Sequence, residues 1–172
     1  MKKLIRQIKG KYQPQLPRSR KEEQEFGPGK IDLLICQECE AVYYAKSWHH
    51  QLEDYQRLSE DKRIKFTLCP ACQMIKDKKY EGLVILREVP QNKKEEVLRL
   101  VQNIGERAYQ RDPLDRIIEI RDRDKNKIEI LTTENQLAVS IGKQIKRAFK
   151  GHLEIKWSHQ ESTARLVWSP IK

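Results

Sequence analysis

The chain has 172 residues, of which 38% are hydrophobic and 35% charged, and its 35 Lys and Arg against 25 Asp and Glu give a net charge of +10. This length excludes an assembly of several large domains, and the low apolar share argues against one thick core. No apolar run is long enough to span a bilayer, and the basic N-terminus lacks the apolar segment of a signal peptide. We therefore expect a cytoplasmic protein with no membrane partner, whose positive charge favours a polyanion such as nucleic acid.

The charge is concentrated at the N-terminus, since residues 1–30 carry a net +6 of the total. Pro and Gly interrupt this segment and no hydrophobic period runs through it, which is typical of a basic extended or disordered arm. Such an arm is either a solubilising tail or a segment that orders against RNA phosphates. Its candidate RNA-binding residues are Lys2, Lys3, Arg6, Lys9, Lys11, Arg18, Arg20 and Lys21.

All four cysteines fall into two Cys-x-x-Cys pairs, Cys36 with Cys39 and Cys69 with Cys72. A spacer of two residues lets two thiolates turn toward one ion, and four thiolates complete a tetrahedral zinc shell. A shell filled by four protein ligands leaves no position for water, so we expect one structural Zn²⁺ and no catalytic metal. With the shell complete, the neighbouring His49–His50 pair is interpreted as surface or packing residues.

Three other uses of the thiols are weaker alternatives. Disulfides are disfavoured in a reducing compartment. A thioredoxin-like redox site needs a single Cys-x-x-Cys at a helix start, whereas two pairs that follow strands are predicted here. Iron or an iron–sulfur centre also takes four thiolates and remains open.

Residues 31–80 are predicted to form a zinc ribbon with an inserted short helix. Leu33–Ile35 and Ala41–Tyr44 flank the first pair as strand, tight turn and strand, and Ile64–Leu68 alternates like a strand before the second pair. An amphipathic helix is predicted between the pairs from the helical spacing of Trp48, Leu52, Tyr55 and Leu58.

Residues 81–172 are predicted to form a ferredoxin-like α/β domain. Their hydrophobic periods give the order β-α-β-β-α-β-β, with one helix between Pro90 and Asp112 and a second from a Thr133 capping box to a C-cap at Gly151. Each helix is predicted to carry one apolar stripe, formed by Val97, Leu100, Val101, Ile104 and Ala108 in the first and by Leu137, Ile141, Ile145 and Phe149 in the second. The strands are expected over 82–86, 114–121, 127–132, 153–157 and 164–168. The fold class is therefore α+β, a zinc ribbon followed by a βαββαβ sandwich with one extra C-terminal strand.

The second helix of this domain carries a basic stripe opposite its apolar face. The stripe is either an ordinary solvated face or a contact to the RNA backbone. Trp157 and Trp168, on alternating strands, are interpreted as core residues and not as base-stacking platforms. The stripe consists of Lys143, Lys146, Arg147 and Lys150.

Motifs for catalysis are missing from the sequence. There is no phosphate-binding glycine loop, no nucleophile elbow and no His-Glu-x-x-His motif. Carboxylates such as Asp122 and Asp124 fall in predicted turns. We therefore expect no catalytic residue, no small-molecule substrate and no enzymatic activity.

The order of these features resembles the Nmd3-type zinc-ribbon family, whose archaeal and eukaryotic members are zinc-binding adaptors for export or assembly of the large ribosomal subunit. It looks most like the small bacterial relatives of that family, over about residues 31–169. The resemblance is carried by both cysteine pairs, Trp48, Pro70, Lys76–Asp77, the segment Pro113-Leu114-Asp115-Arg116-Ile117, Ile128, Ile130, Leu137–Ala138 and Ile141–Gly142.

This resemblance implies association with ribosomal RNA or a ribosomal subunit as an assembly, quality-control or dormancy factor. The larger family members have more cysteine pairs and further domains, and the sequence shows no leucine-rich export segment, so nuclear export is not implied. The alternative is a protein-interaction adaptor, in which the zinc ribbon docks a protein partner without direct RNA contact.

Overall fold

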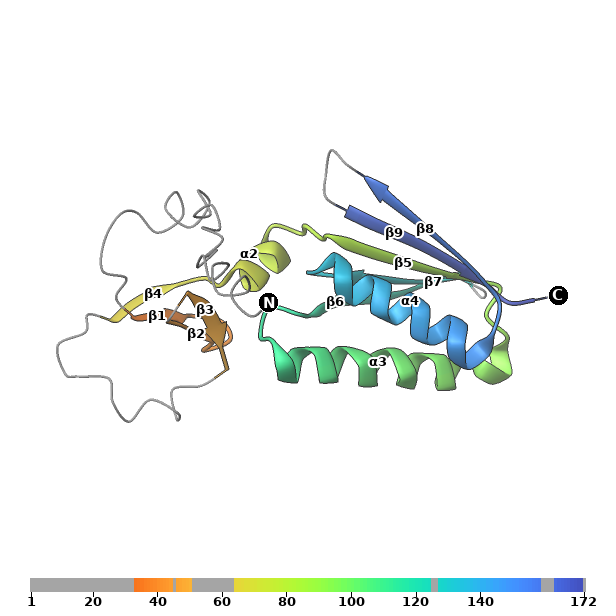
Figure 1. Cartoon of the computed structure of the whole chain (residues 1–172), viewed down its shortest axis with the longest axis horizontal. Helices are drawn as coiled ribbons and strands as arrows, with labels where there is room; N and C mark the ends of the chain where they lie inside the picture. Colours follow the sequence, from red (N-terminus) through yellow and green to blue (C-terminus); the bar gives the residue numbers. More distant parts are fainter. Residues whose placement is uncertain (1–32, 45, 51–63, 125–126, 159–162, 172) are drawn as a thin grey trace, which may run out of the picture. The chain divides into compact units, whose positions relative to one another are not determined.

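Two mixed β-sheets and three α-helices make up the part of the chain that the computed structural model describes, residues 33–44, 46–50, 64–124, 127–158 and 163–171 (Figure 1). All of these residues belong to one compact unit. The chain is α+β, as predicted, whereas the boundaries expected near residues 30 and 80 stay a prediction. None of the described helices is long and apolar enough to cross a membrane.

The smaller sheet has four strands in the order β3-β2-β1-β4. β1 pairs antiparallel with β2 and parallel with β4, and β2 pairs antiparallel with β3. The strand-turn-strand around the first cysteine pair and the strand before the second are confirmed. The bounds are β1 Leu33–Cys36, β2 Val42–Tyr44, β3 Ser47–His49 and β4 Ile64–Thr67.

The predicted helix between the cysteine pairs is wrong at Trp48. This residue lies in β3 directly opposite Tyr43, with ring centroids 5.4 Å apart, and both side chains are buried. Cross-strand aromatic packing of this kind stabilises a sheet and overrides the helical spacing. The other members of the predicted stripe, Leu52, Tyr55 and Leu58, lie outside the described residues.

The larger sheet has five strands in the order β6-β7-β5-β9-β8. The predicted order of elements along the chain is confirmed, although β6 begins three residues later than expected and extends to Asp124. Asp122 and Asp124 therefore lie in a strand and not in the predicted turn. β5 is antiparallel to β7 and parallel to β9. In a split βαβ sheet β8 would pair directly with β5, whereas here β9 lies between them. The exact ferredoxin-like arrangement is therefore not confirmed and stays a prediction. The bounds are β5 Gly82–Arg87, β6 Ile117–Asp124, β7 Lys127–Thr132, β8 His152–Ser158 and β9 Thr163–Ser169.

Two long helices cover one face of the larger sheet (Figure 1). Their predicted apolar stripes are confirmed: Val97 and Ile104 of one helix and Ile141 and Ile145 of the other are buried in the core with alternate residues of the strands. The helices are α2 Pro70–Lys76, α3 Lys94–Arg111, which follows the 3₁₀ turn η1 Gln91–Lys93, and α4 Asn135–Phe149.

The predicted capping box at Thr133 is wrong. α4 begins after Glu134, which makes no side-chain capping bond. The Thr133 hydroxyl instead donates to the Leu114 carbonyl at 2.6 Å and accepts the Arg116 N–H at 2.8 Å. Because Thr133 is 1% exposed, these bonds satisfy polar groups that burial would otherwise leave unpaired.

The two predicted core tryptophans behave differently. Trp168 of β9 is buried, and its indole Nε1 donates to the Lys150 carbonyl at 2.7 Å. Trp157 of the edge strand β8 is 48% exposed, so its assignment to the core is wrong.

Candidate metal centre

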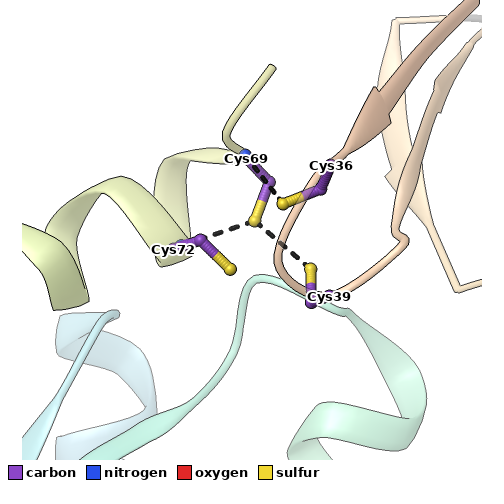
Figure 2. Close-up of side chains that lie close together, drawn as sticks. All are labelled: Cys36, Cys39, Cys69 and Cys72. Carbon is purple, nitrogen blue, oxygen red and sulfur yellow. Dashed lines mark hydrogen bonds between the residues drawn. The ribbon is translucent and has the colours of Figure 1, made fainter. Parts of the chain in front are cut away.

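The four cysteines converge in space, as Figure 2 shows, although the two pairs are 29 residues apart in the chain. Their Sγ atoms all lie within 4.8 Å of one another. A tetrahedral ion with metal–sulfur bonds of about 2.3 Å places neighbouring sulfurs about 3.8 Å apart, and the Cys39 and Cys69 sulfurs are 3.6 Å apart. The cluster, in which Cys39 alone is partly exposed, can therefore hold one metal ion.

The first pair sits on a tight turn between two strands. Cys36 ends β1 and its N–H donates to the Ala41 carbonyl at 2.8 Å, while the Glu40 N–H donates back to the Cys36 carbonyl at 3.0 Å. Glu40 takes the left-handed conformation, with φ of 61°, which closes the turn. Cys36 and Cys39 thereby direct their sulfurs to the same group of four (Figure 2).

The second pair begins a helix. Cys69 is the N-cap of α2, Pro70 occupies the first turn, and the Cys72 N–H donates to the Cys69 sulfur at 3.4 Å. The pair follows β4, as predicted, but it also has the helix-start position that a redox pair would need. The Cys39 sulfur beside Cys69 makes the arrangement a group of four thiols, which a two-cysteine redox site does not require.

Parallel pairing of β1 with β4 brings the two pairs together. In this register Cys36 is opposite Thr67, and the Gln37 N–H donates to the Thr67 carbonyl at 2.9 Å. Both strands therefore deliver their cysteines at the same end of the sheet. The Cys69 N–H then donates to the Cys36 sulfur at 3.2 Å, a direct bond between the two knuckles.

The four thiols experience unequal environments. Burial raises the pKa of Cys36, but the backbone N–H groups of Cys69 and its other neighbours lower it by more, to about 6. Burial raises the pKa of the Cys69 thiol well above its ordinary value, and burial raises that of Cys72 to about 11 despite the charge of Arg116. A divalent cation would favour the thiolate at every position, because only deprotonated cysteines bind metals.

The neighbouring histidines lie outside this group of sulfurs. His49 contacts the Ser47 hydroxyl at 2.8 Å, and its ring centroid lies 3.9 Å from that of Tyr44. His50 Nε2 hydrogen-bonds the Tyr109 carbonyl of α3, and the two rings meet edge to face with centroids 4.6 Å apart. Both make packing contacts of the kind expected from the sequence.

One residue at the cluster was missed by the sequence interpretation. Arg116, just before β6, donates from Nη1 to the Cys72 sulfur at 3.3 Å. Burial lowers the pKa of its guanidinium, but the sulfurs of Cys39, Cys72 and Cys69 raise it by more, so the group stays a cation. No local pattern relates residues 44 positions apart, and the chain fold alone reveals the contact.

The predicted RNA-binding residues divide into two groups. The eight cations of the N-terminal arm, from Lys2 to Lys21, lie outside the described residues. Three of the four predicted cations lie in α4, whereas the fourth, Lys150, is the C-cap with φ of 58°, so its place on the helical stripe is wrong. All four are exposed, and no ion pair joins them to a carboxylate within the described part of the chain. They are Lys143, Lys146, Arg147 and Lys150.

Comparison with known proteins adds no relative to this picture. No protein family, curated protein or solved structure matches the sequence. The interpretation of the cysteine cluster therefore rests on its own geometry.

Proposed function

We propose that this protein is a zinc-binding factor that associates with ribosomal RNA or a ribosomal subunit, in assembly, quality control or dormancy. The observation that carries the zinc part is the group of four sulfurs within 4.8 Å. Sulfurs this close surround one ion and leave no room for the bridging sulfides of an iron–sulfur cluster. Zn²⁺ suits four thiolates in a closed shell, so its role here is structural.

The RNA part is supported by the uncompensated charge of α4. This helix has no acidic residue from Asn135 to Phe149, so its exposed cations are available to phosphates. α3, which covers the same face of the sheet, mixes both signs and forms the ion pair Arg99–Glu95. Uncompensated Lys and Arg bind RNA by releasing counterions. The resemblance to the Nmd3-type family supports a ribosomal target, and we propose a relationship to that family.

The zinc part is tested on the purified full-length protein. Elemental analysis is expected to find one zinc per chain, and X-ray absorption four sulfur ligands at about 2.3 Å. A single iron, an oxygen ligand from water, or a folded protein without metal would each contradict a structural zinc.

The ribosomal part is tested by sedimentation of cell extracts through sucrose gradients. The protein is expected to migrate with ribosomal particles in low salt and to leave them in high salt, because phosphate contacts weaken as salt rises. Crosslinking in the low-salt peak then maps the RNA. Free migration at every salt concentration would contradict the proposal.

A matched pair of variants distinguishes binding through the α4 stripe from a general effect of positive charge. Replacing the three α4 cations and the C-cap Lys150 by Gln is expected to lower affinity for ribosomal particles by about 100-fold or more at low salt and to flatten the salt dependence. The control removes four exposed cations from η1 and α3, with little expected effect on binding. An equal loss in both variants would show that bulk charge, and not α4, drives association. The control positions are Lys93, Arg99, Arg107 and Arg111.

The alternative, a protein adaptor, is favoured by one specific surface. Ile64 and Phe66, on the same face of the edge strand β4, are 53% and 64% exposed, and large exposed apolar side chains mark protein docking sites. Replacing both by Ser is expected to leave ribosome association unchanged if α4 carries it. Release of this variant from the particles, with the α4 variant still bound, would favour the adaptor.

A further inference from the structure

The side chain of Arg116 is held at the four-cysteine cluster by several contacts. Its Nη1 lies 3.3 Å from the Cys72 sulfur, its Nε donates to the Pro113 carbonyl at 2.7 Å, and its guanidinium carbon lies 5.2 Å above the Tyr109 ring. Its Nη2 is buried and has no hydrogen-bond partner within the described residues. A buried N–H₂ without an acceptor is costly, so its position beside acceptor sulfurs has to be explained.

A metal–thiolate group supplies the hydrogen-bond acceptors and the negative charge that this guanidinium lacks. Four thiolates and one Zn²⁺ carry a net charge of about −2, and each sulfur keeps lone pairs that accept hydrogen bonds. A planar guanidinium presents two parallel N–H donors, whereas a lysine presents a point charge. Arg116 therefore matches a pair of thiolates better than one neutral thiol.

The backbone of Arg116 is fixed as firmly as its side chain. Its N–H donates to the Thr133 hydroxyl at 2.8 Å, and its carbonyl accepts the Thr133 N–H at 3.0 Å. Thr133 is buried at the junction between β7 and α4. A change in the position of Arg116 would therefore also displace Thr133, just before the start of α4.

A second contact between the cysteine region and α3 converges on the same place. His50, next to β3, hydrogen-bonds the carbonyl of Tyr109, and the Tyr109 ring is the one that Arg116 covers. Both contacts therefore involve the same residue of α3. Together they form a continuous path from the sulfurs to α3 and to the β7–α4 junction.

We propose that Arg116 is a positioning residue of the metal centre, which donates hydrogen bonds to the thiolates, offsets part of their charge and couples metal binding to the packing of α3 and the β7–α4 junction. This inference rests on the zinc part of the proposed function and is independent of RNA binding. Partners that bond to metal ligands typically contribute 10- to 100-fold to metal affinity. The effect of removing the guanidinium should fall in that range.

Metal affinity tests the proposal with the full chain and Co²⁺ or Zn²⁺ as probe, in competition with a chromophoric chelator. Arg116→Gln is expected to weaken metal binding by about 10- to 100-fold, and Arg116→Lys by less, since it keeps the charge but loses the paired donors. Arg99→Gln, which removes an exposed cation from α3, is the control and should bind like the wild type. Equal affinity in Arg116→Gln and wild type would overturn the proposal, and so would equal losses in Arg116→Gln and Arg99→Gln.

Two readouts distinguish this role from a merely structural one. The sulfur-to-Co²⁺ charge-transfer band is expected to move to longer wavelength in Arg116→Gln, because thiolates without hydrogen bonds hold their electrons less tightly. Removing metal from the wild type should also speed hydrogen exchange at the amide N–H of Arg116 and Thr133, with little further effect in Arg116→Gln. An unmoved band together with unchanged exchange would overturn the coupling. If Arg116→Gln does not fold, Arg116→Lys decides by the same measurements.

Failure of this inference is distinguishable from failure of the proposed function. A wild-type chain that takes up no metal, or does so without a four-thiolate spectrum, contradicts the zinc centre itself. A wild-type chain with that spectrum, whose Arg116 variants bind metal equally well, contradicts the role of Arg116 alone.

Discussion

The four-cysteine region, Leu33–Lys76, and the α/β region, Gly82–Ser169, are built on different physical bases. The α/β region buries apolar side chains from two helices and from alternate positions of its strands in one continuous core. The cysteine region has a short sheet whose β4 is largely exposed, and the seven-residue helix α2 buries two residues, Ala71 and Cys72. Small folds with little apolar core depend on a metal or a covalent link. We therefore expect the fold of the first region to depend on the proposed metal and that of the second on packing.

Removal of one metal ligand is the largest expected test of this difference. In Cys69→Ser, the apparent binding energy of a structural zinc, on the order of 10 kcal/mol, is lost, and the fold of the cysteine region with it. NMR amide signals of residues 33–76 should collapse toward random-coil positions, while those of residues 82–169 stay dispersed.

Chelation of the wild-type protein is the companion experiment, and added Zn²⁺ should restore the dispersed signals there but not in Cys69→Ser. A cysteine region that stays folded without metal would remove the contrast. Unfolding of both regions together would show that metal loss, acting through Arg116, destabilises the α/β region by more than its own core packing stabilises it.

A cavity in the α/β core tests the other half of the comparison. Ile141 of α4 is fully buried, so Ile141→Ala should lower the free energy of unfolding by about 3 kcal/mol. Zinc content should stay at one per chain, because the sulfurs are untouched. Chemical denaturation and elemental analysis measure the two quantities, and Ile171→Ala, at a residue 76% exposed, is the control with a change below about 0.5 kcal/mol. Loss of zinc from Ile141→Ala would contradict independent stabilisation.

Sequence patterns correctly predicted the features that depend on short segments of the chain. The stripes of α3 and α4 follow from the helical period of residues such as Val97, Ile104 and Ile141, which needs no knowledge of partners. The cysteine cluster followed from ligand type and spacing. The helical stripes and each Cys-x-x-Cys pair are properties of short segments, and both appear in the structure, where the pairing of β1 with β4 brings the two cysteine pairs together.

Tertiary pairing explains what the sequence could not predict. Trp157 and Trp168 alternate alike in their strands, but β8 is an edge strand and β9 lies inside the sheet, so one tryptophan is exposed and the other is buried. Thr133 has the spacing of a helix cap, yet its hydroxyl donates to the Leu114 carbonyl of a loop distant in sequence. Arg116 contacts Cys72 across 44 residues. Alternation and spacing specify faces and ends of elements, whereas strand order and contacts between elements come from the whole chain.

Glu134 adds a pH-dependent contribution to the stability of the α/β region, which distinguishes this region further from the cysteine region. Burial raises the pKa of the Glu134 carboxyl, and the negative charges of Glu81, Asp115 and Asp112 raise it further, to about 7. The folded state thus binds this proton more tightly than the unfolded chain, whose glutamates titrate near 4.5. The resulting stabilisation is complete below about pH 4.5 and is lost as pH rises toward 7.

Glu134→Gln removes this titration, so we expect the variant to exceed the wild type in stability at pH 8 by about 1 kcal/mol, a figure reduced for partial exposure to solvent. Near pH 4.5 the two proteins should differ little. Thermal unfolding of both at pH 5 and pH 8 with saturating zinc gives the difference, and protonation of the thiolates cancels because both proteins keep all four. Glu106→Gln, at an exposed position of α3, is the matched control for the loss of a carboxyl group from the α/β region. A difference between Glu134→Gln and wild type that is the same at both pH values would place the effect of Glu134 in packing and not in its charge.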